Sequence, residues 1–418
     1  MTPGLSRDHA AALDRSDPLA GFRDRFHVEE GGPVYLDGNS LGPLPLAAAE
    51  AARRTVEREW GDGLVESWEH WIDLPQRIGG RIAPLIGADP AEVTLADSTS
   101  VNLYRLAAAA MDAFPARRTI LTDDGNFPTD RYVLEGVAAE RGGTLRVIEA
   151  DPVDGVTAGA VEAAMDGDVA LASFSLVSYR SAAFADMAAI GAAVRAGGSL
   201  TLWDLSHAVG SVPVDLGGAG ADLAVGCTYK YLSGGPGAPA FLFVRRALQG
   251  ALRPPIQGWF AHEDQFGFHR GFRRASGIAG WLVGTPPILS TAAAAAGIDL
   301  VAEAGIEAIR AKSIAATGLL IDLADRRLAP FGAGVATPRD PARRGSHVAL
   351  RHPDGLALSR WLRAERRVVT DFRAPDTLRI AVSPLVTRFV EVWDAIEAAA
   401  EGLESGAHRE WAARPAVT

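Results

Sequence analysis

Residues 199–231, SLTLWDLSHAVGSVPVDLGGAGADLAVGCTYKY, contain two short apolar runs, 199–203 and 222–226, whose length and composition are typical of buried strands. Asp204 follows the first run directly, and Lys230 follows the second after three residues. A glycine-rich loop and a further apolar run come next. Because ligands in open α/β sheets bind beyond the carboxyl ends of strands, we expect Asp204 and Lys230 to share one ligand site.

The surrounding sequence alternates strand-like and helix-like segments. The predicted strands are 119–122, 144–148, 169–172, 199–203, 222–226 and 240–244, and predicted helices include 161–165 and 184–196. The segment 45–87 before them is mainly helical in pattern. Strands that alternate with helices form βαβ units, so the sequence predicts an α/β domain with a mostly parallel sheet.

The pattern changes after Pro286-Pro287. One long helix is predicted over 288–325, followed by strands at 346–351, 367–372 and 377–382 and helices at 355–365 and 388–401. We therefore expect a large α/β domain over residues 46–289 and a small α+β domain over 290–418. Residues 1–45 are expected to pack with the small domain.

Composition restricts the class of protein. The 418 residues are 48% hydrophobic and 22% charged, with a net charge of −10, which argues against general nucleic-acid binding. No apolar run is long enough to cross a membrane, and the N-terminus lacks a signal-peptide pattern, so we expect a cytoplasmic protein. The single cysteine, Cys227, is expected to pack as a small apolar side chain, and it excludes an internal disulfide and a cysteine metal cage. His262 has no histidine at metal-ligand spacing, so no metal site is expected and a polar surface role is preferred.

The pairing of Lys230 with Asp204 indicates a chemistry. Burying an ammonium group is costly, and burial makes a lysine amine nucleophilic and able to form a Schiff base. An aspartate on the preceding strand is a suitable partner for a protonated pyridine nitrogen, so the two residues predict a pyridoxal 5′-phosphate site. Each residue alone has an ordinary interpretation: Lys230 as a surface lysine, and Asp204 as the cap of a helix through 206–208.

The chain resembles the kynureninase family, a group of fold-type I pyridoxal phosphate enzymes related to class V aminotransferases. The segments that carry this resemblance, in family order, are 36–42 (LDGNSLG), 98–103 (STSVNL), 127–130 (FPTD), 203–210 (WDLSHAVG), 227–232 (CTYKYL), 258–260 (GWF), 284–288 (GTPPI), 378–380 (LRI) and 384–385 (PL). The resemblance implies a large domain with a seven-stranded, mostly parallel sheet and a homodimer with active sites at the subunit interface. It also implies hydrolytic Cβ–Cγ cleavage of L-kynurenine or a substituted kynurenine to an anthranilate and L-alanine.

The resemblance also implies a role for individual residues. Lys230 would form the Schiff base and shuttle protons, Asp204 would pair with the pyridine nitrogen, and Tyr229 would relay protons and contact the phosphate. The other implied cofactor contacts are Thr99 and Ser100 at the phosphate, Phe127 stacked on the ring, Asp130 near the ring hydroxyl, Ser175, His207, and Trp259 with Thr285 from a neighbouring subunit. Arg379 would bind the substrate carboxylate, with Asn39 and Ser40 at the substrate end.

Ordinary interpretations of these residues stay open at this point. Phe127 could be a core aromatic, Asp130 a turn or cap residue, and Thr99 and Ser100 a helix cap. Asn39 could belong to a turn, and Arg379 could be a surface arginine on a strand edge.

Two alternatives for function also remain. Members of the family often carry histidine where this chain has Leu176 and glycine where it has Ala182, and the aromatic stretch 68–71 departs from the usual spacing. These changes leave the substrate open, and a kynureninase-like enzyme that acts on a cysteine S-conjugate, by β-elimination or decarboxylation, is the alternative. A module that holds the cofactor without turnover is disfavoured, because Lys230, Asp204 and Arg379 are all retained.

Overall fold

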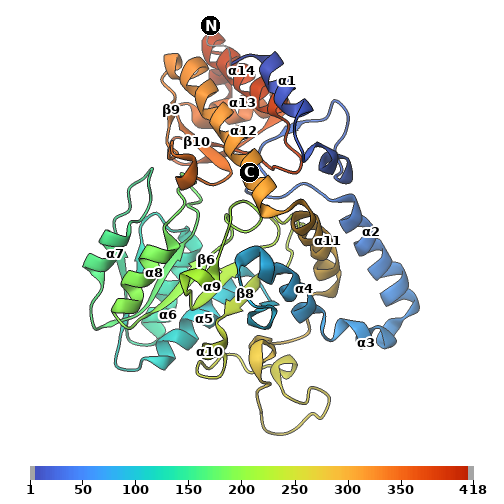
Figure 1. Ribbon diagram of the computed structural model, residues 1–418, viewed down its shortest axis with the longest axis vertical. Coiled ribbons are helices and arrows are strands. Elements are labelled where there is room, and N and C mark those ends of the chain that lie inside the picture. The colour runs from blue at the N-terminus through green and yellow to red at the C-terminus, as the bar shows by residue number, and fades with distance from the viewer. Residues whose placement is uncertain (1–4, 413–418) are drawn as a thin grey trace.

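The computed structural model describes residues 5–412, so residues 1–4 of the predicted N-terminal segment and 413–418 of the predicted small domain lie outside it. Its central element is a seven-stranded sheet (Figure 1). Across the sheet the order is β2 (Val93–Leu95), β8 (Phe241–Val244), β7 (Leu223–Gly226), β6 (Leu200–Asp204), β5 (Val169–Ser175), β3 (Thr119–Asp123) and β4 (Thr144–Ile148). Only β8 is antiparallel to the other described strands of this sheet. The predicted mostly parallel seven-stranded sheet is therefore confirmed.

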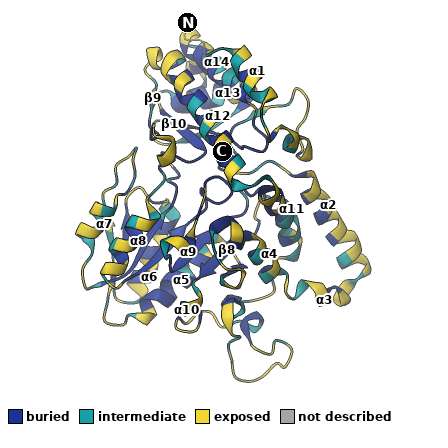
Figure 2. Cartoon of the chain, viewed as in Figure 1, coloured by how far each residue is buried: buried dark blue, intermediate teal, exposed yellow. Residues whose placement is uncertain are grey.

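Helices cover both faces of this sheet, whose strands are almost wholly buried except for the edge strand β4 (Figure 2). One face packs on α5 (Thr99–Ala113) and α6 (Pro128–Glu140). The other face packs mainly on α4 (Leu74–Ile82), α7 (Ala158–Ala164) and α8 (Met187–Ala196). The other helices of this part are α2 (Leu46–Arg54), α3 (Trp68–Trp71), α9 (Leu216–Ala219) and α10 (Arg246–Gln249). The strands are apolar on both faces because both faces are covered.

The long helix predicted over 288–325 is two helices, so that prediction is wrong in one respect. Gly305 has a φ of 77° and separates α11 (Ile288–Ala304) from α12 (Ile306–Arg327). Such a backbone conformation ends a right-handed helix and suits glycine. α11 packs on α2 and α4, whereas α12 packs on the C-terminal elements. The predicted domain limits at 289 and 290 stay a prediction.

The C-terminal part has its own sheet and core. Its four antiparallel strands are, in order, β12 (Asp371–Arg373), β13 (Thr377–Ala381), β10 (His347–Arg351) and β9 (Gly334–Val335). α12, α13 (Gly355–Glu365) and α14 (Phe389–Ser405) supply the rest of its core, as an α+β arrangement requires. A short parallel pair, β1 (Val34–Tyr35) with β11 (Val368–Val369), attaches the N-terminal chain to this part.

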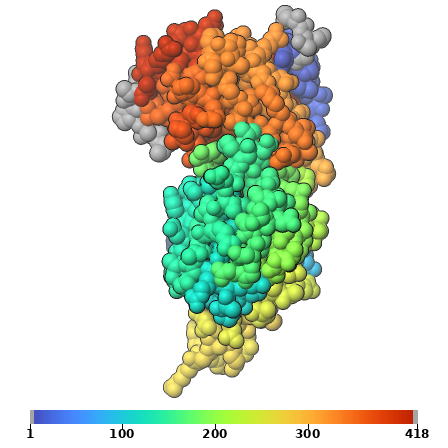
Figure 3. Space-filling model, turned by 90° about the vertical axis from the view of Figure 1, so that its left-hand side faces the viewer, coloured from blue at the N-terminus to red at the C-terminus, as the bar shows by residue number. Residues whose placement is uncertain are grey.

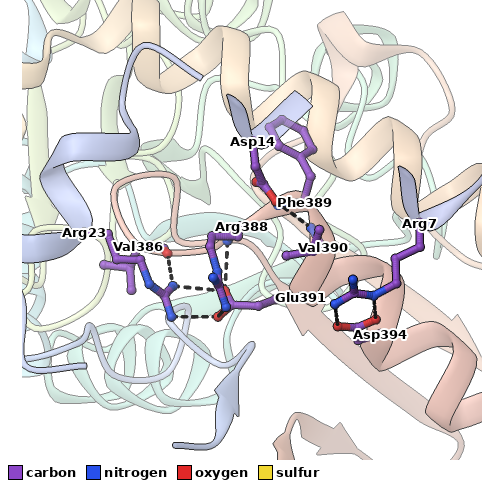
Figure 4. Close-up of polar contacts among 9 residues, drawn as sticks. All are labelled: Arg7, Asp14, Arg23, Val386, Arg388, Phe389, Val390, Glu391 and Asp394. Carbon is purple, nitrogen blue, oxygen red and sulfur yellow. Dashed lines mark hydrogen bonds and ion pairs between the residues drawn. The ribbon is translucent and has the colours of Figure 1, made fainter. Parts of the chain in front are cut away.

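The N-terminal segment also holds the start of α14 (Figure 4). α1 (Arg7–Arg15) places the Asp14 carboxylate where it accepts the backbone N–H of Phe389 at 2.7 Å. Two ion pairs flank this contact: Arg7 with Asp394 and Arg23 with Glu391, both at 2.7 Å. A carboxylate at a helix N-terminus satisfies free N–H groups and complements the helix dipole, so the segment fastens α14 to the chain start.

Within residues 5–412, no helix is both long enough and apolar enough for a membrane span.

Candidate active site

Four parallel strands end at the sheet edge that faces the C-terminal part. β6 ends at Asp204, β5 ends at Ser175, and β7 leads through Cys227 to Lys230. β3 leads through Phe127 into α6, whose first turn carries Asp130. The shared edge follows from the parallel topology, because strands that run the same way end on the same side. The fold therefore brings together the residues that the sequence analysis placed around the cofactor ring.

Lys230 contacts a histidine. Its Nζ lies 2.9 Å from Nε2 of His207, 6.0 Å from the ring centre of Phe127 and 5.9 Å from that of Tyr229. The residue is half-buried, so the amine is less enclosed than the sequence analysis expected. Burial and the charge of Lys230 lower the pKa of His207 well below its usual value. His207 is therefore neutral near pH 7, and its Nε2 accepts a hydrogen bond from the amine.

The sequence contains two lysines, so a Schiff-base lysine has to be Lys230 or Lys312, and this count could have been used from the sequence alone. The second, Lys312, is buried and forms an ion pair with Asp17 at 2.6 Å. A buried ammonium held by a carboxylate is a structural group rather than a nucleophile. Lys230 is thus the lysine that is placed for covalent chemistry.

Asp204 and Asp130 form a buried carboxyl pair. Oδ1 of Asp204 accepts the backbone N–H of Ser206 at 2.8 Å and its hydroxyl at 2.6 Å, which fixes the orientation of the carboxylate. The two aspartates share a side-chain hydrogen bond. Burial first, and the charge of Asp204 second, raise the pKa of Asp130 well above its usual range. Asp130 therefore holds the shared proton, and Asp204 keeps the negative charge.

Several buried polar atoms at this edge have no partner in the described residues. They are Oδ2 of Asp130, Nδ1 of His207, both amide atoms of Asn39, and Nε of Arg379. Buried polar atoms are nearly always satisfied, so a group of unpaired ones marks a place built for a ligand. Together with the amine of Lys230 and the anionic carboxylate of Asp204, these groups fit a protonated heterocycle that carries an aldehyde. The residues present therefore fit pyridoxal 5′-phosphate.

Thr99 and Ser100 begin α5, a helix of 15 residues. Ser98 caps this helix, and neither the Thr99 nor the Ser100 side chain is hydrogen-bonded within residues 5–412. The loop before the helix is tied to the segment after Lys230, since the carbonyl of Asp97 accepts the N–H of Ala240 at 2.9 Å. A helix N-terminus with free hydroxyls is a suitable phosphate site.

Phe127 and Ser175 border the carboxyl pair. The Phe127 ring is 36% exposed, a large fraction for a phenylalanine at a domain junction, and it meets Tyr179 edge-on at 5.2 Å between ring centres. The Ser175 hydroxyl donates to Oδ1 of Asn126 at 2.7 Å. Tyr229 lies against Cys227, and burial raises its pKa above the usual value. Cys227 itself is buried, as predicted.

Arg379 is brought to the site by β13 and is 1% exposed, so it is not the surface arginine of the ordinary interpretation. Its Nη1 donates to the carbonyl of Tyr179 at 2.5 Å, and its Nη2 contacts Asp371 and lies 3.4 Å from the Ser40 hydroxyl. Asn39 is also buried. The predicted substrate residues thus meet at the junction of the two parts.

Trp259 and Thr285 do not join the other predicted residues within this chain. Trp259 packs in an aromatic cluster with Trp68, Phe260 and Phe266, and Thr285 is exposed. The segment after Trp259 projects at the end of the molecule away from the C-terminal part (Figure 3). Their proposed position in a neighbouring subunit's site stays a prediction.

Three residues near the site were missed: Tyr179, His347 and Asp371. His347 is wholly buried, and its ring centre lies 5.6 Å from that of His207. The one local signal was a histidine inside the apolar strand 346–351. His262 corrects another expectation, because it is 8% exposed rather than on the surface, and its Nδ1 accepts the N–H of Asp264 at 2.9 Å. This local hydrogen bond satisfies Nδ1, whereas Nε2 is buried without a partner among residues 5–412.

Across residues 5–412, no three histidine, cysteine, aspartate or glutamate side chains are grouped as metal ligands would be.

The comparisons with known proteins agree with the geometry. A family model described as aminotransferase class-V matches residues 34–336, and one described as kynureninase C-terminal domain matches residues 309–399. A kynureninase from Burkholderia pseudomallei (strain K96243) is 44% identical over 99% of this chain and 100% of its own length. A kynureninase from Pseudomonas fluorescens is 42% identical over 97% of each chain.

Solved structures add the fold. A cysteine desulfurase from Escherichia coli superposes with a TM-score of 0.78 over 93% of this chain and 98% of that one, at 18% identity. At this identity the likeness shows a shared fold and no shared reaction.

Proposed function

Because the chain belongs to the kynureninase family, we propose that it cleaves L-kynurenine or a substituted kynurenine hydrolytically between Cβ and Cγ, giving an anthranilate and L-alanine. The observation that carries the proposal is the identity of 42% and 44% to two kynureninases over nearly the whole chain. The enzyme depends on pyridoxal 5′-phosphate. Cleavage of a cysteine S-conjugate is not favoured, since the sequence identity to a cysteine desulfurase is only 18%.

Pyridoxal 5′-phosphate, when bound, supplies an electron sink for charge that develops on the amino acid. We propose that Lys230 holds it covalently through Nζ and that Asp204 faces its ring nitrogen. The other residues proposed to hold it are Thr99, Ser100 and Tyr229 at the phosphate, Phe127, Asp130, Ser175 and His207 at the ring, and Trp259 and Thr285 from a second copy.

The protein's own contribution at Lys230 is proton handling. The neutral imidazole of His207 accepts a hydrogen bond from Nζ across 2.9 Å and so holds the amine in position for proton transfer. At the carboxyl pair, Asp130 is protonated and neutral, and it donates a hydrogen bond to Asp204. Asp204 then presents one negative charge, oriented by Ser206, to a cationic ring nitrogen.

Arg379 is proposed to bind the α-carboxylate of the substrate, with Asn39 and Ser40 beside it. Its burial excludes water from the ion pair, which strengthens the pairing. Tyr229 is proposed to relay protons next to Lys230.

Product identification tests the reaction. The holoenzyme is incubated separately with L-kynurenine, 3-hydroxykynurenine and a cysteine S-conjugate, and products are identified by mass spectrometry. Release of alanine and an anthranilate from the kynurenines is expected. Pyruvate, ammonia and a thiol from the S-conjugate, with kynurenine untouched, would overturn the proposal.

We further propose a homodimer in which Trp259 and Thr285 complete the site of the second copy. Large apolar side chains are exposed near these residues, with Leu64 61%, Val65 77% and Phe268 78% exposed. Sedimentation analysis gives the oligomeric state. Mixing inactive Lys230→Ala with Trp259→Ala after subunit exchange should restore about a quarter of the sites, because one site of each mixed dimer is intact. Monomeric protein, or no restoration on mixing, would contradict shared sites.

We also propose a cytoplasmic location, which suits a chain whose one cysteine is a free thiol. Cell fractionation tests it.

A further inference from the structure

The buried guanidinium of Arg379 has one donor without a partner. Nη1 donates to Tyr179, and Nη2 contacts Asp371, but Nε has no hydrogen-bond partner among residues 5–412. A carboxylate binds arginine most specifically through two parallel N–H groups, and Nε with Nη2 form such a pair. Nε is therefore open, and Nη2, the other nitrogen of this fork, is already in contact with a carboxylate of the protein itself.

Asp371 has a second cation within reach. Its Oδ2 lies 3.0 Å from Nη2 of Arg373 and accepts the Ser40 hydroxyl at 3.2 Å. The Arg373 side chain is 40% exposed, whereas that of Arg379 is 1% exposed. The carboxylate thus lies between a buried arginine and one that reaches solvent. Moving it to Arg373 alone needs only a small displacement and leaves it paired.

We propose that Asp371 occupies the carboxylate-binding fork of Arg379 in the free enzyme and moves to Arg373 when the α-carboxylate of an amino acid binds. The inference rests on the proposed function, in which Arg379 binds that carboxylate. A second carboxylate at the Nε–Nη2 fork would lie directly against the like charge of Asp371, which already contacts Nη2, so the ligand displaces Asp371. A buried guanidinium without a paired counter-charge is costly. Asp37 adds a negative charge nearby, and Asp371 is the carboxylate in direct contact with Arg379 between turnovers.

The exchange has a consequence for specificity. A ligand with a carboxylate replaces Asp371 charge for charge, so Arg379 stays neutralised. A ligand with a neutral amide at the same position offers no charge and leaves Asp371 in place. Asp371 therefore makes the site select for an ionised α-carboxylate.

The test compares the holoenzyme with Asp371→Asn, an isosteric change that removes the charge. Calorimetric titration with L-alanine and with L-alaninamide measures the dissociation constants. Asp371→Asn should bind L-alanine about tenfold more tightly, while L-alaninamide binding changes less than about twofold. Asp371→Glu should return L-alanine binding to the wild-type value. Weaker L-alanine binding in Asp371→Asn, or equal shifts for both ligands, would show that Asp371 merely holds Arg379 in position.

Arg373→Gln provides a second, independent variant. It removes the alternative partner of Asp371 and should weaken L-alanine binding, and unchanged binding would contradict the exchange. Asp376→Asn is the matched control, since Asp376 lies in the same hairpin and pairs with the exposed Arg351 at 2.8 Å. Failure of wild type to release anthranilate from kynurenine would count against the proposed function, whereas the alanine-to-alaninamide comparison reports on Asp371 alone.

Discussion

The amine of Lys230 and the imidazole of His207 lie 2.9 Å apart, so a loop after β7 and a turn after β6 form one functional pair. The contact exists because β6 and β7 are parallel neighbours that end at the same edge. Burial keeps His207 neutral, so its Nε2 can accept a hydrogen bond from the amine, whereas a charged ring would repel it.

Substitution of the two lysines should separate their roles. Lys230→Ala should abolish both turnover and the visible absorption of bound cofactor, because it removes the only lysine outside an internal ion pair. Lys312→Arg keeps the pairing with Asp17 and should retain both properties. Borohydride reduction followed by peptide mass mapping should find the label on Lys230. A label on Lys312 would show that Lys230 is not the Schiff-base lysine.

His347 should make stability depend on pH. Burial first, and the charge of Arg379 second, hold its pKa well below 6.5 in the folded protein, so the unfolded chain binds more protons below that pH. Stability contributed by this group is complete above pH 6.5 and is lost as pH falls toward the folded pKa. Wild type should lose up to about 1.4 kcal/mol per pH unit relative to His347→Gln in that window.

Urea unfolding of both forms between pH 5 and pH 8 measures this difference. A constant difference across the range would mean that His347 takes up its proton equally in both states.

Arg105 should support the proposed phosphate site. Its wholly buried guanidinium pairs with Asp97 at 2.7 Å, contacts Asn102 at 3.1 Å and donates to the carbonyl of Trp281. Asp97 has a φ of 43° directly before the cap of α5, so the ion pair holds a strained residue. Arg105→Leu should cost about 2–4 kcal/mol, because it leaves the buried carbonyl of Trp281 and the buried Asn102 side-chain oxygen without this donor.

Denaturant unfolding gives the stability, and equilibrium titration with pyridoxal 5′-phosphate gives the affinity. Asp97→Asn, at a side chain that is 35% exposed, should cost less than Arg105→Leu. Full cofactor affinity in a folded Arg105→Leu protein would show that the loop does not depend on this pair.

Gly42 should tolerate no side chain. Its N–H donates to the carbonyl of Tyr229 at 2.7 Å, and an added Cβ would collide with the backbone of Lys230 and Ser233. Gly42→Ala should therefore displace the Lys230 loop and reduce kcat more than stability. Gly136→Ala is the control, because that helical position has open space and alanine should add up to about 1 kcal/mol. Equal activity of the two variants would refute the close approach.

The cofactor side of the site could be predicted because its residues are local features of strand ends. Asp204 and Lys230 each follow a recognisable apolar run, and parallel topology alone brings such positions together. The strand at 93–95 was missed, since three residues are too few for a periodic pattern. The break at Gly305 was missed because an alanine-rich helical pattern continues on both sides of it.

The carboxylate side could not be predicted as fully. Tyr179, His347 and Asp371 come from a loop of the large sheet and from β10 and β12, and they meet only when the two parts pack together. No spacing in the sequence relates residues that are joined by packing between separate elements. Arg379 itself was found through family motifs, whereas its internal counter-ion was visible only in three dimensions.

The contacts between α1 and the start of α14 can form only late in synthesis of the chain. Asp14 leaves the ribosome 375 residues before its partner Phe389. At bacterial or eukaryotic translation rates this interval lasts roughly 20–75 s. During that time the apolar side of α1, including Ala10, has no native surface to cover it. The packing of α1 is therefore completed only after α14 has been made.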